Sequence, residues 1–378
     1  MLRVETNVPY GNACDISITR EGGTDVAAFA ADPHGGPECL WFCFRLVEDD
    51  PAAGVPGRVK LILKHFRNIL GGGKPENIRP VIKPAGGEWQ RMERGVREDL
   101  PDGRCQAAWH VDAPRSFADI ALCYPYGRPE LDALVSDTAG YWGADTIGVS
   151  QGRRPIIRLS NAPGAEGSSR PGLYLIARQH SGETPGSWVL DGFLRRVATL
   201  GHAAPLVWAV PLSNIDGVEQ GDYGKDNFPY DLNRAWGVQP MRHETLVIAC
   251  DIREWTRRCR AVLGIDFHAP GACETEGIYT FHPRLDAFRR KEADRWAAAV
   301  QKALTREFAM ERFASEATYP SRWETPNFGL HCYTAAGVEG LSLETPYSMI
   351  GDTILTRERY QEAGRRIAEG VAGEAGTL

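Results

Sequence analysis

The chain has 378 residues, of which 43% are apolar and 24% are charged, and its formal net charge is −6. This length suits two domains or one large domain, and the composition is ordinary for a globular protein. The acidic balance argues against a nucleic-acid partner, because nucleic-acid binders normally carry a basic surface. No stretch approaches the ~18 uninterrupted apolar residues of a membrane span, so we expect no membrane partner either.

The N-terminus and the cysteines point to a cellular compartment. Residues 1–7 contain no apolar run of the kind that a signal peptide requires. The nine cysteines are irregularly spaced and include no C-x-x-C pair. They predict buried thiols rather than disulfides or a cysteine-held zinc site. Together these features predict a cytoplasmic protein.

Residues 1–125 are predicted to form a β-sandwich domain. Apolar residues alternate with period 2 at residues 40–46 and 59–64, and residues 105–111 are expected to form another strand. Short strands separated by Gly and Pro, with no helical period, are typical of a small antiparallel sandwich.

Residues 126–378 are predicted to form a second, catalytic domain in which strands alternate with helices. Thr184 is expected to cap the first long helix, with Pro185 at its first position. Alternating strands and helices indicate an α/β sheet with helices on both faces. The expected strands are 173–177, 206–210, 262–267 and 340–343, and further helices are expected at 286–308 and 357–371.

Two short motifs match known patterns without their structural context. Residues 148–152 read G-V-S-Q-G, which fits the G-x-S-x-G nucleophile elbow of serine hydrolases. That elbow needs a helix directly after the serine, whereas residues 153–159 are predicted to be a strand after a hairpin turn. The run at residues 71–74 is no phosphate-binding loop, because no Ser or Thr follows its lysine.

A candidate metal site combines His180, Glu183 and His268. The first two residues follow one predicted strand and His268 ends another, and open α/β sheets place their ligand sites at such strand ends. Two histidines and a glutamate are a ligand set of catalytic zinc sites, which leave one position open. We therefore expect one zinc ion per chain, with Asp231 or Asp266 orienting a ligand imidazole.

Two further features make this constellation more specific than its members taken singly. Asn233 and Arg234 are adjacent and flanked by aromatic residues, and guanidinium groups bind carboxylates through two parallel hydrogen bonds. Glu344 ends an apolar strand, and a carboxylate buried beside a metal is placed to act as a general base.

The chain resembles the zinc metallocarboxypeptidases of the carboxypeptidase A superfamily, and more closely their cytosolic carboxypeptidase branch. We expect it to be a bacterial member of that branch. The resemblance covers nearly the whole chain. The matching motifs are W-F-x-F-R at 41–45, C-Y-P-Y at 123–126, the G-x-S-x-G-R entry at 148–153, A-R-Q-H-x-G-E at 177–183, N-x-D-G-V at 214–218 and D-L-N-R-x-W at 231–236.

This resemblance implies a fold and an activity. The fold is a central mixed sheet flanked by helices and preceded by a β-sandwich. The three candidate ligands would bind zinc, Glu344 would be the general base, and Asn233 and Arg234 would hold the terminal carboxylate of the substrate. The partners would be peptide or protein C-termini, with acidic tails one candidate class.

The chain departs from the branch at identifiable positions. The branch has G-N-Y-R where residues 221–225 read G-D-Y-G-K, so an arginine that polarises the scissile carbonyl is missing. Lys225, one residue further on, is predicted to supply the positive charge. Ser181 replaces a proline, which we expect to be harmless. The active-site tyrosine of the family corresponds to Tyr319 or Tyr333, both of which precede the predicted base.

Two alternatives to a carboxypeptidase remain open. One is a different enzyme on the same scaffold, a deacylase of N-acyl amino acids or a muropeptide amidase. The other is a catalytically weak binder of acidic C-terminal tails, which the missing arginine favours. Neither the preferred terminal residue nor the oligomeric state follows from the sequence.

Overall fold

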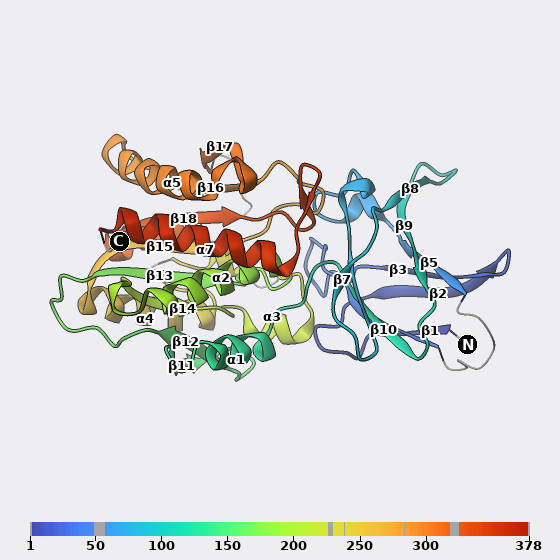
Figure 1. Cartoon of the computed structure of the whole chain (residues 1–378), viewed down its shortest axis with the longest axis horizontal. Helices are drawn as coiled ribbons and strands as arrows, with labels where there is room; N and C mark the ends of the chain where they lie inside the picture. Colours follow the sequence, from blue (N-terminus) through green and yellow to red (C-terminus); the bar gives the residue numbers. More distant parts are fainter. Residues whose placement is uncertain are drawn as a thin grey trace.

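The computed structural model describes residues 2–48, 57–225, 230–237, 239–282, 284–317 and 325–376. Figure 1 shows a part made of strands, which contains the N-terminus, beside a part made of helices around a sheet, which contains the C-terminus. We call residues 2–121 the β region and residues 128–376 the α/β region. The two ends of the chain lie at opposite ends of the molecule.

Two five-stranded sheets form the β region, with the strand orders β1-β4-β10-β6-β7 and β2-β3-β5-β9-β8. Neighbouring strands are antiparallel, except that β3 and β5 are parallel. The predicted antiparallel architecture is confirmed apart from this pair. The strands are β1 Leu2–Glu5, β2 Cys14–Glu21, β3 Thr24–Ala30, β4 Cys43–Glu48, β5 Arg58–Leu63, β6 Val81–Pro84, β7 Gln90–Arg91, β8 Val96–Asp99, β9 Cys105–Asp112 and β10 Phe117–Ala121.

The two sheets of the β region share one hydrophobic core. The rings of Phe29 in β3 and Phe44 in β4 come from different sheets, and their centroids are 4.5 Å apart. The strand predicted at residues 40–46 begins only at Cys43, although residues 40–42 are also buried. Apolar alternation reports which side chains are buried, and it does not require that the backbone pairs with a neighbour.

An eight-stranded mixed sheet forms the centre of the α/β region, in the order β11-β12-β14-β13-β15-β18-β16-β17. Strands β14, β13, β15 and β18 are parallel to one another, whereas β11–β12, β12–β14 and β16–β18 are antiparallel pairs. The strands are β11 Gly143–Val149, β12 Pro155–Ser160, β13 Pro171–Ala177, β14 Leu206–Val210, β15 Arg260–His268, β16 Ile278–His282, β17 Ala309–Glu316 and β18 Glu339–Glu344, and a separate hairpin joins β19 Met349–Ile350 to β20 Thr353–Ile354.

Helices flank this sheet, as predicted. Helix α7 packs against both α2 and α5, whereas α4 packs against α6, and members of both groups contact strands of the sheet. The central strands are therefore nearly continuous apolar runs, as strands covered on both faces require. The helices are α1 Arg128–Asp137, α2 Thr184–Leu200, α3 Ile215–Gln220, α4 His243–Arg258, α5 Ala287–Phe308, α6 Phe328–Ala336 and α7 Arg357–Glu374.

Helix α2 starts where the sequence predicted, but the predicted cap is wrong. Thr184 is the first helical residue rather than the cap, and its hydroxyl has no hydrogen-bond partner among the described residues. Glu183 occupies the capping position and makes no side-chain capping bond. Its carboxylate faces two imidazoles instead, so the site takes the side chain that would otherwise cap the helix.

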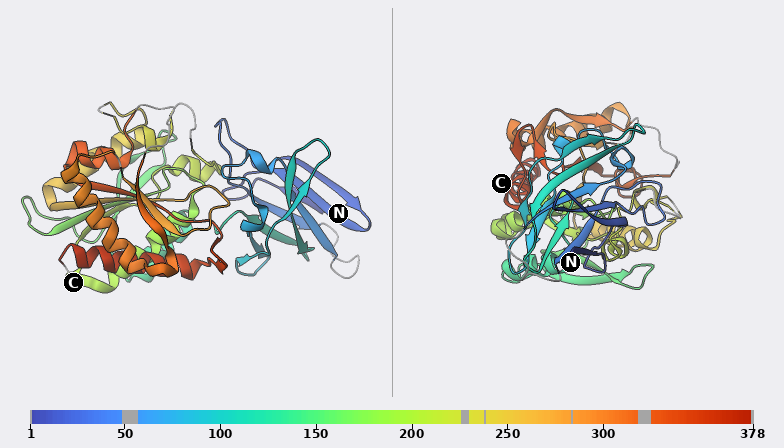
Figure 2. Two further views of the ribbon diagram at one scale, coloured as in Figure 1. Left: turned by 90° about the horizontal axis from the view of Figure 1, so that it is seen from above. Right: turned by 90° about the vertical axis from the view of Figure 1, so that its right-hand side faces the viewer.

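The β region contacts the loops that follow the central strands of the α/β region, and Figure 2 shows it at one end of that region. Trp41 lies against the loop after β13, because a Cβ atom on Gly182 would be 2.8 Å from the Trp41 Cβ. Arg91 Nη2 donates a hydrogen bond of 2.6 Å to the carbonyl of Tyr347, three residues after β18. The β region thus contacts two of the loops at this end of the sheet.

The cysteines agree in part with the prediction that they are buried, unpaired thiols. All nine cysteines fall within the described residues and are free thiols, but five of them are buried and Cys250 is exposed. The prediction of buried thiols is thus correct for only part of the set.

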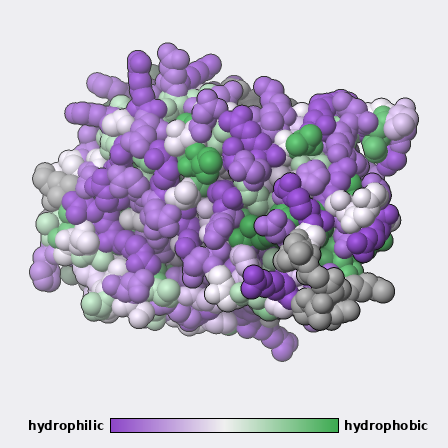
Figure 3. Space-filling view, turned by 45° about the vertical axis from the view of Figure 1, so that its right-hand side comes forward, coloured by the Kyte–Doolittle hydropathy of each residue, from purple (hydrophilic) through white to green (hydrophobic). Residues whose placement is uncertain are grey.

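None of the helices in the described ranges combines the length and apolar character needed to cross a membrane. The face in Figure 3 is mainly hydrophilic, with small separate apolar patches.

Candidate active site

His180, Glu183 and His268 meet at the carboxyl ends of two adjacent parallel strands. His180 and Glu183 lie in the loop after β13, and His268 is the last residue of β15. His180 Nδ1 lies 2.8 Å from Glu183 Oε1, and His268 Nδ1 lies 2.7 Å from Glu183 Oε2. One potential ligand atom from each residue falls within 4.8 Å of the others, and all three residues are buried.

The other ring nitrogen of each imidazole, Nε2, faces the carboxylate of an aspartate. Asp231 Oδ1 and Oδ2 each lie 3.1 Å from His180 Nε2, and Asp266 contacts His268 Nε2. Burial lowers the pKa of both histidines, but the charges of Asp231 or Asp266 and of Glu183 outweigh it. The pKa of His180 is raised to about 9. The sequence suggested that either aspartate would orient an imidazole, and the structure places one at each ring.

This donor set suits a zinc ion. With Nε2 of each ring directed to a carboxylate, Nδ1 is the nitrogen that faces the common point, and Zn²⁺ accepts imidazole nitrogen and carboxylate oxygen together. The anionic carboxylates around the two rings also require a compensating positive charge in a buried position. A divalent cation among the three ligand atoms meets both requirements.

Glu344 lies beside the candidate metal site. It ends β18, where its Cα is paired with that of His268 in the parallel β15–β18 ladder. Its Oε2 is buried and has no hydrogen-bond partner among the described residues. The pKa of Glu344 is raised to about 7: burial raises it most, the charge of Glu183 adds to the increase, and the charges of His268 and Lys225 oppose it. A carboxylate with this pKa can exchange a proton near neutral pH.

Asn233 and Arg234 lie in a short 3-10 turn, Leu232–Arg234, that Asp231 begins. Asn233 Nδ2 lies 3.0 Å from His268 Nε2, and Asn233 Oδ1 accepts a hydrogen bond of 3.0 Å from the backbone N–H of Phe328. Arg234 Nη1 donates to the Asn233 carbonyl at 2.8 Å. The structure thus brings Asn233 against the candidate ligands, with Arg234 next to it.

Lys225 ends the described segment that precedes Tyr230, and it is partly buried. Burial lowers its pKa, but the charges of Glu183 and Glu344 outweigh burial and leave the pKa raised. Of the charges that act on this ammonium group, those of Glu183 and Glu344 are the largest. Its proposed role at the site stays a prediction.

Of the two tyrosines predicted as candidates for the active-site tyrosine, only Tyr333 lies within the described residues. Tyr333 lies on α6 and points away from the site, because its hydroxyl donates to Asp286 at 3.5 Å and the Arg289 guanidinium lies 4.8 Å from its ring centroid. Tyr319 falls outside the described residues.

Two buried residues at the site were missed by the sequence analysis. Tyr223 donates its hydroxyl hydrogen to Glu183 Oε1 at 3.5 Å. Gln179 is fully buried, donates to Asp266 and accepts from Trp236 Nε1 at 2.6 Å, so it holds the carboxylate that faces His268. The position of Gln179 directly before the first ligand was the one signal that marked it.

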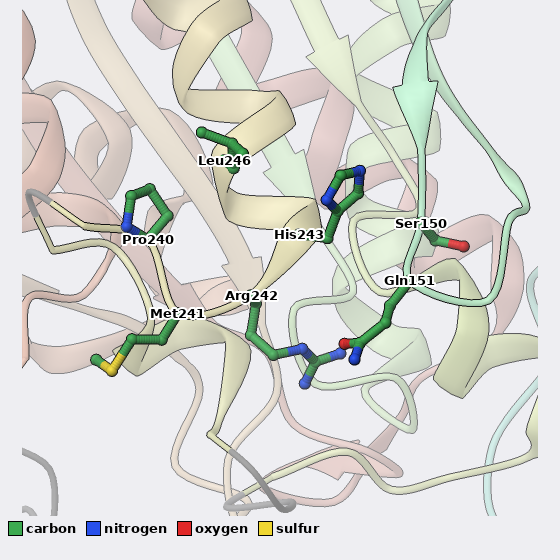
Figure 4. Close-up of a pocket in the computed structure, with 7 residues that line it drawn as sticks. All are labelled: Ser150, Gln151, Pro240, Met241, Arg242, His243 and Leu246. Atoms are coloured by element: carbon green, nitrogen blue, oxygen red, sulfur yellow. The ribbon is translucent and has the colours of Figure 1, made fainter.

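A different pocket, of about 480 Å³, opens at the start of α4 and is lined by Ser150 of the G-x-S-x-G motif (Figure 4). Ser150 Oγ donates to Asp216 at 2.7 Å and accepts from the Arg154 backbone N–H at 2.9 Å. In Figure 4 the hydroxyl of Ser150 points away from the ring of His243. Strands β11 and β12 form a hairpin around this turn, as predicted, so Ser150 is a structural residue.

Sequence comparisons identify relatives that match part of the chain. No family model matches the sequence. Mouse cytosolic carboxypeptidase 6 is 29% identical over 214 residues, which are 50% of this chain and 40% of that protein. Zebrafish cytosolic carboxypeptidase 2 is 28% identical over 282 residues, which are 65% of this chain and 38% of that protein. The chain thus spans about two fifths of the length of these relatives.

Solved structures match over the whole chain. A metallo-carboxypeptidase from Burkholderia cenocepacia superposes with a TM-score of 0.80 at 17% identity, covering 100% of this chain and 99% of that one. A metallo-carboxypeptidase from Pseudomonas aeruginosa, in complex with (2-guanidinoethylmercapto)succinic acid, gives a TM-score of 0.74 at 18% identity and covers 99% of both chains.

The chain has the fold of the metallo-carboxypeptidases, a class of metal-dependent hydrolases, with the β region included in the superposition. The two sequence relatives reported above are cytosolic carboxypeptidases, the branch that the motifs at residues 177–183 and 231–236 resemble.

Proposed function

We propose that the protein is a zinc metallocarboxypeptidase that removes the C-terminal residue from peptides or proteins. The observation that carries this proposal is the convergence of His180, Glu183 and His268 at the ends of adjacent strands, with Glu344 beside them on the next strand. This arrangement supplies a metal site and a general base at one point. The relatives bear the same activity in their names.

A zinc ion held by His180, Glu183 and His268 would supply a Lewis acid that polarises a peptide carbonyl and lowers the pKa of water. Glu344 takes a proton from the attacking water and returns it to the leaving amine. Its Oε2 has no hydrogen-bond partner in the described part of the chain and can accept that proton, and its raised pKa matches the task.

Asn233 and Arg234 restrict the reaction to chain ends, because only a terminal residue presents a free carboxylate. Asn233 Nδ2, 3.0 Å from His268 Nε2, is an amide donor beside the candidate metal site, where it can reach the carboxylate of a substrate. The Arg234 guanidinium is the adjacent bidentate donor. Lys225 stabilises the negative charge that develops on the scissile carbonyl oxygen.

The proposal also covers the domain organisation, the cellular location and the substrate class. We propose a two-domain chain divided at residues 125 and 126, with both five-stranded sheets before this boundary and the eight-stranded sheet after it. The name of the relatives suggests a cytoplasmic location, and nine free thiols are consistent with a reducing compartment. Acidic C-terminal tails are the substrate class to test first.

A peptide library read by mass spectrometry tests the proposal. The zinc-loaded protein is incubated with peptides that differ in their last residue, acidic tails included, and with the same peptides amidated at the C-terminus. We expect loss of single C-terminal residues from the free acids and no reaction of the amides, because an amide lacks the carboxylate.

Three other outcomes would contradict the proposal. Turnover of N-acyl amino acids or muropeptides, with none of peptides, would assign a deacylase or an amidase. Tight binding of acidic tails without turnover would assign a binding protein. Equal cleavage of free and amidated peptides would remove the carboxylate clamp from the mechanism.

A further inference from the structure

The loop of residues 221–225, which ends at Lys225, is held against the β region. Asn12 Nδ2 donates a hydrogen bond of 2.8 Å to the carbonyl of Gly221. Gly221 has a φ of 75°, and a Cβ atom there would clash with the carbonyl oxygen of Gly11. Only glycine therefore tolerates both this backbone conformation and this close approach.

Asn12 is itself a fixed anchor. It is 1% exposed, its Nδ2 also donates to the Asp32 carbonyl at 2.9 Å, and its Oδ1 accepts from the Asp32 N–H at 2.8 Å. Its backbone pairs with Cys43 in both directions, at 2.7 and 2.9 Å. Every polar group of Asn12 is thus engaged, and the side chain cannot reorient without breaking hydrogen bonds in a buried position.

The loop is held on its other side by the segment that carries the candidate zinc ligands. Ser181 Oγ donates to the Asp222 carbonyl at 3.0 Å, and the Gly182 N–H donates to the Tyr223 carbonyl at 2.9 Å. His34 of the β region adds a contact of 2.7 Å between its Nδ1 and Asp222 Oδ1. The loop therefore spans the gap between the β region and the zinc ligands, with Lys225 at its end.

We infer that Asn12 is a positioning residue for Lys225, and that the β region in this way takes part in stabilising the transition state. A flexible lysine contributes to an oxyanion site only if its backbone is fixed, because the ammonium must occupy one place when charge develops. Gly221 and Gly224 both have positive φ and leave the loop with little stiffness of its own. The hydrogen bond from Asn12 restrains the start of the loop from the side of the β region.

This inference rests on the proposed function and on the role of Lys225 in it. It predicts that the effect of Asn12 on the reaction passes through Lys225. Substrate binding through Asn233 and Arg234 lies on a different segment, so the effect falls on kcat and not on KM.

A double-mutant cycle tests the inference. The kcat and KM for a good peptide substrate are measured for the full chain, Asn12→Ala, Lys225→Ala and the double variant. We expect Asn12→Ala to lower kcat by at least about 10-fold with KM within about 2-fold, and to change kcat by less than about 2-fold when Lys225 is already alanine.

Two further variants control for general effects on folding. His34→Ala removes a partly exposed contact to the same loop and should reproduce a smaller loss that also disappears in the Lys225→Ala background. Asp119→Ala breaks the ion pair with Arg45 inside the β region, which does not touch the loop, and should leave kcat unchanged. Zinc content and melting temperature are recorded for every variant. If Asn12→Ala does not fold, the His34→Ala cycle decides.

The outcomes separate the inference from the proposed function. A wild-type chain without peptidase activity would overturn the proposed function. An active wild type in which Asn12→Ala has no effect on kcat, or lowers it equally in both backgrounds, would overturn the inference alone. An unchanged kcat in Lys225→Ala would overturn it as well.

Discussion

Glu344 lies directly opposite His268 in the parallel pair of β15 and β18, so the proposed base and a proposed zinc ligand share one rung of the sheet. Backbone hydrogen bonds fix the register of this pair. The relative position of the two side chains is therefore set by the most rigid part of the fold, and not by a loop. This rigidity suits a reaction in which proton transfer and metal binding must occur at adjacent points.

The first prediction concerns the metal ligands. Purified protein should contain about one zinc ion per chain, and His180→Ala or His268→Ala should lose it, because either change removes one of three protein ligands. The melting temperature should change little, since a catalytic site is not the source of the fold. Elemental analysis and thermal unfolding check this, and a variant with full zinc occupancy and full activity would show that the assignment is wrong.

The second prediction concerns the carboxylates behind the ligands. Asp231→Asn and Asp266→Asn keep shape but lose the charge that each directs to a histidine Nε2. Each should weaken zinc affinity by roughly 10–100-fold, the usual effect of removing such a partner. Competition with a zinc chelator measures the affinity. Asp119→Asn, at a distant ion pair, is the matched control and should bind zinc as the wild type does.

The third prediction concerns Glu344→Gln, which keeps the size of the side chain and removes the base. The variant should retain zinc and still bind peptide, while kcat falls by at least ~10²-fold. Steady-state kinetics and isothermal titration with a slow substrate give the two quantities. A kcat within a few-fold of the wild type would exclude Glu344 from proton transfer.

The fourth prediction concerns Lys225. A positive charge near the developing oxyanion stabilises the transition state more than the ground state, so Lys225→Ala should lower kcat rather than raise KM. The expected loss is roughly 10²–10³-fold, the range for one oxyanion donor. Lys225→Arg should recover part of it, limited by the larger planar group. An unchanged kcat in the alanine variant would leave the oxyanion to other donors.

The fifth prediction concerns pH and the chelator-treated, metal-free protein. Burial raises the pKa of Glu344 from 4.5 to about 7, so the folded state binds this proton more tightly than the unfolded state. Between these two values the folded state carries more protons, and its stability falls as pH rises. The free energy of unfolding of the wild type, relative to Glu344→Gln, should therefore decrease from pH 5 to pH 8. Denaturant titration measures it, and a pH-independent difference would contradict the assignment.

Much of the candidate site was predictable because it lies at strand ends. The runs before His180, His268 and Glu344 are short and apolar, and buried parallel strands have this character. Once three such strands are assigned to one sheet, their carboxyl ends must share an edge. The topology of the sheet then brings together the polar residues that stand at the ends of these strands.

Other features were not predictable, because they depend on contacts between distant segments. Thr184 has the residue type and position of a helix cap, yet Glu183 occupies that position and turns to the imidazoles. Tyr333 precedes the base at a suitable distance in the chain, but helix α6 directs it toward Asp286. A local pattern gives no information on which of several neighbours a side chain meets.

The sequence by itself determined which residue types the candidate site contains, because the three ligands, the glutamate and the Asn–Arg pair are properties of residues and their spacing along strands and turns. The tertiary structure alone decided how those groups are aimed. It placed one aspartate behind each imidazole, and within the described ranges it gave Glu344 Oε2 no hydrogen-bond partner. It also tied the Lys225 loop to Asn12, 209 residues before Gly221. Such long-range hydrogen bonds form only when the chain has folded, since their energies depend on burial and distance between segments that the sequence does not relate.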